Sequence, residues 1–558
     1  MAGTPGTAPP ESVENRYDPF LLVLAALVFF VGLGANSIWD ANEAFYVDTP
    51  RHMVQTQDYV TPRFNGEERL NKPVLSYWIV AAFYQAFGIS VTSERIAIAV
   101  GALGILLATF ALGRRLRSTA TGVLAALLLA TAPRFIHFAR RNVIDIYLTL
   151  FMAIALVAFV RAMQRPNERR PWLLVMYTAI GLGVLTKGPV ALLLPAAVIG
   201  VWLLVERRLS DLRHFSLPLG ALIVLAIVVP WYAALQGRHG WDPIWTFFVG
   251  ENLGRFASSM TTDRSPFFFA GVLFGDILLP WAPLLLIPLW TGWRRTPDAD
   301  GAGSIRRLLW LWVVVIVVGF SFSASKEDLY ILPVAPAAAA LIAEVLVGTG
   351  AGARHRGVRI ILIVVCAVVV ALGAAVWWLL GSGYYRVADA AIVSGLLIAG
   401  GLLTIGLIVM RRYTVALATI AGTFVAFNWL FVVRVLPAVE PLKPVPALVE
   451  ILKRRATYDA PVASFHLSQP SLVFYLSRPV PELWDDNEVV AFFTTQPEAW
   501  LVTSDAEFTR LAPRLPMACV AWRRPRFDAR LPDVLRGVPP PNIALVTNRC
   551  PGIGSPPR

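Results

Sequence analysis

Long apolar runs separated by short polar loops dominate the hydropathy pattern of this 558-residue chain. A helix needs about 20 apolar residues to cross about 30 Å of hydrocarbon, so each run of that length predicts a membrane-spanning helix. The pattern therefore predicts a polytopic α-helical membrane protein with about thirteen spans. They lie at about residues 19–37, 91–112, 118–133, 143–162, 172–187, 189–205, 216–235, 268–292, 306–323, 330–346, 359–380, 388–410 and 414–434.

Both ends of the chain depart from this pattern. Residues 1–18 are polar and rich in Pro, Gly and Thr, so we expect a disordered cytoplasmic tail. They lack the basic start and the cleavage site of a signal peptide, so we expect the first span to stay in the protein. After residue 436, short apolar runs alternate with helical patterns, which predicts a small α/β domain over residues 437–558. The transmembrane domain is expected over residues 19–436, with outer loops at 38–90 and 236–267.

Composition and charge agree with a membrane protein. The chain is 56% hydrophobic and only 15% charged, and its formal net charge is +13. The positive charge lies mostly in alternate short loops, which is the positive-inside pattern, so we reject nucleic acid as a partner. The N-terminus is then inside and the C-terminal domain is exocytoplasmic. The basic loops are Gly113 to Arg117, Arg161 to Arg170, Glu206 to Arg213, Trp293 to Arg307, Ala351 to Arg359, and Arg411 with Arg412.

Several charged residues break the rule by falling at the predicted outer ends of spans. Any one of these cations has an alternative explanation, because lysine and arginine near a span end can reach the interface. Several cations beside Asp40, Glu43 and Asp145 instead favour an anionic phosphate held in a partly dry cleft. For Asp145, a simple ion pair with a neighbouring arginine is an equal alternative. The outer cations are Lys72, Arg140, Arg141, Lys187, Arg255 and Lys326.

Short motifs around these residues resemble the large membrane glycosyltransferase family that uses polyprenyl-phosphate sugars. That family includes the bacterial 4-amino-4-deoxy-arabinose transferase of lipid A and, more distantly, the protein O-mannosyltransferases. The resemblance covers about residues 20–335. Its best pieces are Asn71-Lys72-Pro73 with Tyr77-Trp78, Thr186-Lys187-Gly188-Pro189, Pro230-Trp231, and Lys326 with Tyr330-Ile331-Leu332-Pro333.

The resemblance implies a GT-C fold and an inverting glycosyl transfer on the outer face of the cytoplasmic membrane. The donor would be a polyprenyl (undecaprenyl) phosphate sugar, hexosyl or pentosyl, and the acceptor a lipid, a glycan or a protein. Lipid phosphate would leave as the acceptor attacks the anomeric carbon. The residues expected to bind the phosphate or the sugar are Tyr46, Lys72, Arg140, Arg141, Asp145, Lys187, Arg255, Lys326 and Tyr330.

The catalytic acid of the family lies in the first outer loop, usually in an Asp-Glu pair. Here Asn42 precedes Glu43, and an asparagine cannot act as a base. We therefore expect Asp40 to be the base, with Glu43 orienting the acceptor or sharing the task. General base assistance contributes about 10²–10⁴ in rate, so losing the true base has a large effect.

Two further departures argue against a metal cofactor. Asn71 stands where the aminoarabinose transferase has a glutamate, and Asn252 stands where it has a histidine. No Cys/His cluster has the spacing of a zinc site. The lysines and arginines would then neutralise the leaving phosphate themselves. The same departures make aminoarabinose a poor choice for the sugar.

Two of the three cysteines, Cys519 and Cys550, fall in the predicted exocytoplasmic domain, whereas Cys366 falls in a span. An oxidising compartment allows a disulfide between the first two, and we favour one. No catalytic constellation stands out in this domain, so its expected role is to cover the outer cavity or to help recognise an acceptor.

Two other functions remain open. A secondary transporter would place ionisable residues near the bilayer midplane in repeated halves, and the sequence contains no such repeat. A non-catalytic protein that binds lipid-linked sugars would be supported if Asp40 and Glu43 point away from Lys72.

Overall fold

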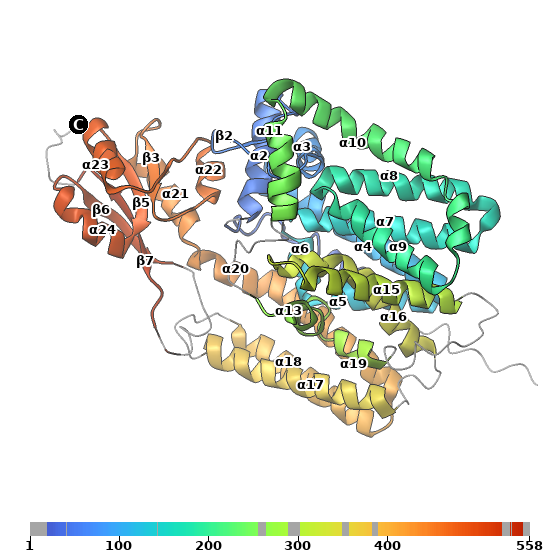
Figure 1. The fold of residues 1–558 in the computed structure, drawn as a ribbon. Coiled ribbons are helices and arrows are strands. Elements are labelled where there is room, and N and C mark those ends of the chain that lie inside the picture. The colour runs from blue at the N-terminus through green and yellow to red at the C-terminus, as the bar shows by residue number, and fades with distance from the viewer. Residues whose placement is uncertain are drawn as a thin grey trace, which may run out of the picture.

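The fold is taken from a computed structural model of the full chain (Figure 1). Most of the chain forms a large helical part. The C-terminal segment forms a smaller part that contains a sheet, and its helix α22 (Ser471–Leu476) contacts α2 (Asn42–Thr56) of the helical part. The structure describes residues 19–40, 42–141, 143–254, 264–287, 302–348, 356–381, 389–526, 536 and 538–550.

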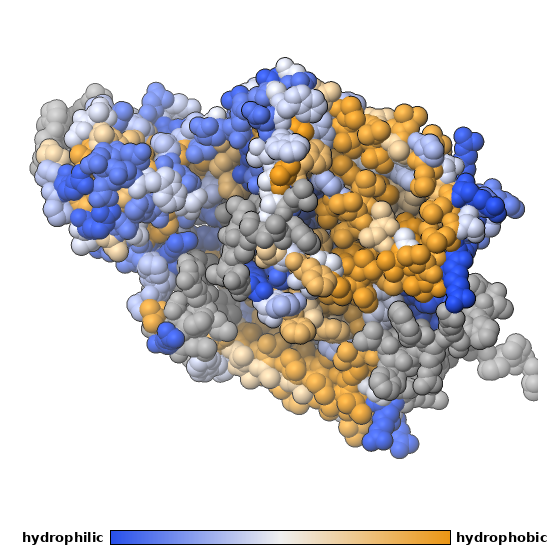
Figure 2. Space-filling view, viewed as in Figure 1, coloured by the Kyte–Doolittle hydropathy of each residue, from blue (hydrophilic) through white to orange (hydrophobic). Residues whose placement is uncertain are grey.

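Within these described ranges, eight helices are long and apolar enough to cross a membrane. A ninth span is present if α5 (Thr119–Thr131) and α6 (Pro133–Ala139), which are bent by 76°, cross together. On the face seen in Figure 2, apolar side chains cover much of the helical part, which suits contact with lipid rather than water. The eight are α4 (Val91–Leu116), α7 (Ile144–Gln164), α10 (Leu217–His239), α15 (Ala302–Ser321), Asp328–Val347, Arg356–Leu379, α18 (Ala390–Val409) and Tyr413–Leu442.

The expected count of thirteen spans is not confirmed, because some predicted ranges form shorter or broken helices. In the range 19–37, α1 (Pro19–Leu27) ends after nine residues and turns follow. In the range 189–205, α9 (Val190–Val205) has only 16 residues. In the range 268–292, α13 (Phe268–Val272) gives way to a π-helical and then a 3₁₀ segment. In the range 268–292, Gly271, Gly275 and Pro280 disfavour a continuous α-helix.

The predicted range 172–187 coincides with α8 (Arg169–Lys187). Three of the eight spans already named are formed largely by α16 (Ala335–Gly348), α17 (Arg356–Val376) and α19 (Tyr413–Leu430). The interior of the helical part is one apolar cluster to which α4, α5, α7, α15, α16 and α17 all contribute buried side chains. The neighbouring helices α7 and α8 pack closely along their length.

The segment predicted as the first outer loop, residues 38–90, is largely helical. It contains α2 (Asn42–Thr56), a two-stranded antiparallel hairpin of β1 (Arg63–Phe64) and β2 (Glu67–Glu68), and α3 (Leu75–Phe87). Two indole groups fasten the loop to the helices, since Trp78 Nε1 donates to the Tyr59 carbonyl at 2.8 Å and Trp231 Nε1 to the Val60 carbonyl at 3.0 Å. These hydrogen bonds tie residues 59 and 60 to α3 and to α10 (Leu217–His239).

The C-terminal part contains a five-stranded sheet in the order β4-β3-β5-β7-β6. Strand β3 is parallel to β4 and β5, whereas β7 is antiparallel to β5 and β6. The strands are β3 (Val462–Phe465), β4 (Glu482–Leu483), β5 (Trp500–Ser504), β6 (Cys519–Pro525) and β7 (Asn542–Thr547); the helices are α20 (Leu436–Val439), α21 (Pro444–Arg455), α22 (Ser471–Leu476), α23 (Asp486–Thr495) and α24 (Asp505–Leu511).

Both faces of this sheet are covered, which explains the unbroken burial of β3. Side chains alternate between the faces of a strand. Val462 therefore packs in the cluster that includes α21 and α22, whereas Ala463 and Phe465 pack in the cluster that includes α23 and α24. That the sheet lies on the outer side of the membrane stays a prediction.

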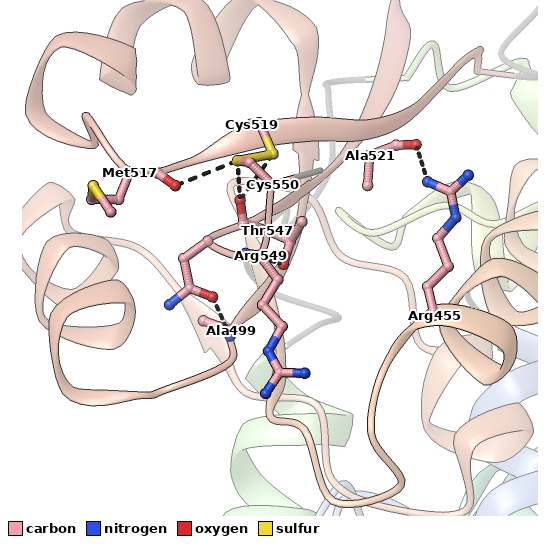
Figure 3. Close-up of a disulfide and its surroundings, with 9 residues drawn as sticks. Arg455, Ala499, Met517, Cys519, Ala521, Thr547, Arg549 and Cys550 are labelled. Atoms are coloured by element: carbon pink, nitrogen blue, oxygen red, sulfur yellow. Dashed lines mark hydrogen bonds between the residues drawn. A yellow bond between two sulfur atoms is a disulfide. The ribbon is translucent and has the colours of Figure 1, made fainter. Parts of the chain in front are cut away.

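A disulfide joins Cys519, at the start of β6, to Cys550, which follows β7 (Figure 3). The two Cα atoms are 5.8 Å apart. The expected pairing is thus confirmed, and Cys366 is a buried free thiol. Because β6 lies at the edge of the sheet, the bond ties the last described residues to that edge.

Candidate active site

A cavity of about 610 Å³ opens where the first outer loop meets the ends of several helices. Its walls combine charged side chains with apolar ones, a pairing that suits an amphipathic ligand. The residues that line it are Tyr46, Lys72, Val143, Ile144, Asp145, Leu148, Lys187, Pro189, Val190, Leu193, Leu194, Glu251, Asn252, Gly319, Phe320, Ser323, Glu327, Leu329 and Tyr330.

The turn between α8 and α9 places one of the two lysines in this cavity. Lys187 is the last residue of α8, and Gly188 follows with φ +96°, a conformation that favours glycine. A Cβ atom at Gly188 would also lie 2.6 Å from the Phe247 ring. Lys187 contacts the carboxylate of Asp145 on α7, and its Nζ lies 5.0 Å from the centre of the Tyr330 ring.

The other lysine comes from the loop that joins β2 to α3. Lys72 Nζ lies 3.2 Å from Glu251 Oε2, and the two side chains are 15% and 18% exposed. Glu251 belongs to a π-helical segment, Thr246–Gly254, in the second outer loop. Within this segment Asn252 Nδ2 donates to the Phe247 carbonyl at 2.7 Å, which stabilises the local turn.

Two aromatic side chains border the same space. Tyr46 of α2 stacks on the buried ring of Tyr77 of α3, with 5.6 Å between ring centres. This stack fixes α2 against α3 and presents the Tyr46 edge to the cavity. Tyr330, which precedes α16, stands beside Lys187.

The apolar wall comes from two helices that pack against each other, α9 and α15. Val190, Leu193 and Leu194 of α9 face Gly319 and Phe320 of α15 across this side of the cavity. Leu193 is 62% exposed, so the wall continues onto the apolar outer surface of the helical part. A hydrocarbon chain has a dry path along it.

The structure gives Asp40 and Glu43, the two acids predicted for catalysis, other partners, and neither lines the cavity. Asp40 accepts hydrogen bonds from the backbone amide and the hydroxyl of Ser471, at 2.6 and 2.8 Å. Glu43 is fully buried and forms an ion pair with Arg95 at 2.9 Å. Its second oxygen accepts from the backbone amide of Trp39 at 2.7 Å.

Burial acts on both carboxyls, but with opposite results. Burial raises the pKa of Asp40, and the hydrogen bonds from Ser471 oppose the rise only in part. Burial would also raise the pKa of Glu43, yet the Arg95 guanidinium, the Arg141 charge and the Trp39 amide together hold that pKa below the ordinary value. Asp40 thus carries its charge at a cost, whereas Glu43 is stabilised as a carboxylate.

Other predicted ligands lie outside the cavity lining. Arg140 is buried and donates to the Val28 carbonyl, and Arg141 approaches the Asp40 carbonyl at 3.5 Å. Lys326 Nζ folds back onto the Ser323 carbonyl at 2.6 Å. Arg255 falls outside the described residues. Of the nine predicted ligands, the cavity is lined by Tyr46, Lys72, Asp145, Lys187 and Tyr330.

The sequence analysis did not single out Glu251. A negative charge in a predicted outer loop is common, and nothing in the local pattern separates this acid from a solvated one. The signal that could have found it is the nearby Asn252, at a position where the resemblance placed a ligand. Glu327, next to Lys326, also lines the cavity unpredicted.

Known proteins match both the sequence and the fold. A family described as dolichyl-phosphate-mannose-protein mannosyltransferase matches residues 71–233. An undecaprenyl phosphate-alpha-4-amino-4-deoxy-L-arabinose arabinosyl transferase of Pseudomonas savastanoi pv. phaseolicola is 30% identical over 355 residues, which are 62% of this chain and 65% of that protein. An uncharacterized protein of Aquifex aeolicus is 30% identical over 333 residues, which are 59% of this chain and 64% of that protein.

The crystal structure of ArnT from Cupriavidus metallidurans bound to undecaprenyl phosphate superposes with a TM-score of 0.76 at 24% identity, covering 96% of this chain and 99% of ArnT. The chain therefore has the fold of ArnT, and in sequence it is similar to glycosyltransferases that use polyprenyl-phosphate sugars. The resemblance drawn from the motifs is thereby confirmed, and so is a multi-pass membrane protein with this fold. The two sequence matches span 65% and 64% of the relatives' own lengths.

Proposed function

We propose that this protein is an inverting glycosyltransferase of the GT-C type that moves a sugar from a polyprenyl phosphate carrier to a lipid, glycan or protein acceptor. The reaction takes place on the outer face of the cytoplasmic membrane, with the N-terminus inside. The observation that supports the proposal best is the cavity, which joins two lysines to an apolar wall that is continuous with the lipid-facing surface.

The charged end of the cavity suits a phosphate. Lys72 and Lys187 reach it from separate segments, and each is already paired with a carboxylate, Glu251 or Asp145. A lysine ammonium is a compact charge that can bind phosphate oxygens, and its side chain can rotate from the carboxylate to the ligand. Tyr46 and Tyr330 border this end and supply hydroxyl groups for a sugar or a phosphate.

The cavity volume of about 610 Å³ is in the range of small-ligand sites. It can hold one sugar phosphate with room for part of an acceptor, while a prenyl chain lies along α9 and α15. A soluble nucleotide sugar would leave the apolar wall without use, which is why a lipid carrier fits better.

The chemistry follows from the charges. As the bond between the anomeric carbon and the phosphate oxygen breaks, negative charge grows on the leaving lipid phosphate, and fixed cations lower that barrier. Lys72 and Lys187 fill this role in our proposal, without a metal cofactor. A single displacement at the anomeric carbon inverts its configuration, with the acceptor entering from the face opposite the phosphate.

A second candidate is a protein that binds lipid-linked sugars without transferring them. It is favoured by one observation, namely that neither Asp40 nor Glu43 lines the cavity. Under this alternative the lysines and the apolar wall still bind the carrier, but no turnover follows.

The test is transfer by purified protein reconstituted in lipid vesicles and supplied with radiolabelled undecaprenyl-phosphate hexoses and pentoses plus a membrane-lipid extract. Labelled product from the wild type, reduced in Lys72→Ala, supports the transferase. Measurable binding of the donors with no product from any of them supports the binding protein. Absence of both binding and product would contradict both candidates.

A further inference from the structure

We propose that Glu251 is the general base that takes the proton from an acceptor hydroxyl group; this rests on the transferase function proposed above. A base is required only if the acceptor is a hydroxyl group, since an ionised phosphate needs none. The inference therefore also assigns the acceptor to the class of alcohols, such as a sugar or side-chain hydroxyl.

Three carboxylates line the described part of the cavity: Asp145, Glu251 and Glu327. Asp145 is 5% exposed and contacts Lys187, so its carboxylate is nearly closed off from the open space that an acceptor hydroxyl group would occupy. Glu327 is 42% exposed at the cavity rim and faces Arg264 at 3.9 Å. A carboxylate so open to water gains little selectivity for an acceptor proton.

The exposed fraction of Glu251 lies between those of Asp145 and Glu327. At 18% exposure it is shielded from bulk water but still borders the open space of the cavity. It is held on an irregular π-helical segment, Thr246–Gly254, a conformation often found at functional sites. The hydrogen bond from Asn252 to the Phe247 carbonyl fixes this segment, so the carboxylate has a defined direction.

The charge balance of the reaction explains why Lys72 is its neighbour. The acceptor oxygen forms a bond to the anomeric carbon while the bond from that carbon to the phosphate oxygen breaks. The carrier changes from a phosphodiester with one negative charge to a phosphate monoester with two, and the acceptor proton goes to Glu251, which becomes neutral. One negative charge thus moves from Glu251 to the leaving phosphate.

Lys72 is positioned for both charge states. Its Nζ lies 3.2 Å from Glu251 before the reaction, and when Glu251 is protonated the same ammonium can neutralise the phosphate. A carboxylate of ordinary basicity suffices, because the acceptor hydroxyl becomes more acidic as its new bond forms. Inverting glycosidases use a carboxylate base for the same reason.

The experiment compares wild type, Glu251→Gln and Glu251→Asp in reconstituted vesicles, with radiolabelled undecaprenyl-phosphate sugars as donors and a membrane-lipid extract as acceptor source. Turnover is measured across pH 4.5–8.5 at saturating donor, and donor affinity is measured separately by competition with undecaprenyl phosphate. Glu168→Gln, in an exposed pair with Arg165, is the matched carboxamide control and should behave as wild type.

For Glu251→Gln we expect turnover to fall by about 10²–10⁴, with loss of the acidic limb of the pH profile. Donor affinity should stay equal or increase, because Lys72 is released from its carboxylate partner. Glu251→Asp should recover part of the turnover. A residue with only a structural role would instead weaken donor binding and turnover together.

The inference is overturned if Glu251→Gln turns over within about threefold of wild type, or if its loss of turnover is matched by an equal loss of donor affinity. It is also overturned if the labelled product carries the sugar on a phosphate group. Failure of the proposed function looks different, since wild type itself would then bind donor without forming any product.

Discussion

The carboxylate of Asp40, in the loop before α2, accepts two hydrogen bonds from Ser471, the first residue of α22. The two residues are 431 positions apart in the chain. Nearby, the Ile38 amide donates to the Tyr475 hydroxyl at 2.7 Å. The membrane part and the C-terminal part are therefore joined at the segment where sequence reasoning placed the catalytic base.

We expect Asp40→Asn to retain the junction, because its amide oxygen still accepts from Ser471 and the neutral group is easier to bury. Asp40→Ala should loosen it by about 1–3 kcal/mol. The measurement is hydrogen exchange over residues 466–476, with Ser471→Ala as the variant that removes one of the two hydrogen bonds. If Asp40→Asn keeps the junction but loses transfer, Asp40 rather than Glu251 acts as the base.

The raised pKa of Asp40 also sets a pH dependence. The folded protein binds this proton more tightly than the unfolded chain, so the stabilising contribution is complete below the ordinary value of 3.8 and is lost as the pH rises through the raised pKa. Asp40→Asn removes this dependence. The change should appear as a flatter pH profile of exchange at the junction in the variant.

Glu43→Gln should behave in the opposite way. Arg95 is 5% exposed on its side chain, and the variant removes its carboxylate partner at 2.9 Å while Glu94 stays at 3.6 Å. Breaking such a buried ion pair costs about 3–5 kcal/mol. Since the pKa of Glu43 is lowered, its contribution is present above the ordinary value of 4.5 and is lost as the pH falls through the lowered pKa. Thermal unfolding in detergent at pH 7, beside the exposed control Glu168→Gln, measures the loss.

The stability of Glu43→Gln decides how a loss of transfer activity in this variant is interpreted. A loss of transfer in Glu43→Gln is expected from misfolding alone, so it does not identify a catalytic acid. If the variant unfolds at the same temperature as wild type, the buried pair with Arg95 contributes little and the prediction is wrong.

The two cavity lysines should differ in their effect on folding. Lys187→Ala leaves Asp145, which is 5% exposed, without this cation, whereas Lys72→Ala leaves Glu251 at 18% exposure. We expect both variants to weaken binding of undecaprenyl phosphate about 10- to 100-fold, because charge-assisted hydrogen bonds contribute about 1.5–3 kcal/mol. Only Lys187→Ala should also lower the unfolding temperature by several degrees. Competition binding and thermal unfolding on the same samples separate the effects.

Gly188→Ala tests the geometry of the turn that presents Lys187. The backbone has φ +96° there, and the new Cβ would lie 2.6 Å from Phe247. We expect a destabilisation of about 1–3 kcal/mol and a weaker affinity for undecaprenyl phosphate. Gly200, whose Cβ would meet nothing within 4 Å, provides the matched control Gly200→Ala. Equal behaviour of the two variants would contradict the proposed role of the turn.

The disulfide between Cys519 and Cys550 closes a chain separation of 31 residues. Its removal in Cys519→Ser/Cys550→Ser should destabilise the C-terminal part by about 3–4 kcal/mol and leave donor binding unchanged, because neither cysteine approaches the cavity. Limited proteolysis with and without reductant follows the C-terminal part, and undecaprenyl phosphate competition follows the cavity. Protease resistance that is unaffected by reduction would contradict this.

The sequence by itself determined the class of the protein. Apolar runs near 20 residues long predict membrane helices whatever their neighbours, and short motifs around Lys72, Lys187 and Tyr330 indicated the family. Cys519 and Cys550 were predicted as disulfide partners because both fall in the predicted exocytoplasmic domain, where oxidising conditions allow a disulfide, whereas Cys366 falls in a predicted span. These features depend on local pattern and composition, which a linear sequence displays directly. Lys72, Lys187, Tyr46, Asp145 and Tyr330 do meet at one cavity.

Tertiary structure alone decided the rest. Asp40 and Glu43 sit beside the motif that suggested catalysis, yet their partners are Ser471 and Arg95, which the sequence places far away. Glu251 enters the cavity because the second outer loop folds back onto Lys72 across 179 positions. A charge pattern shows which groups need a partner but not which partner they find, since long-range packing brings the two together.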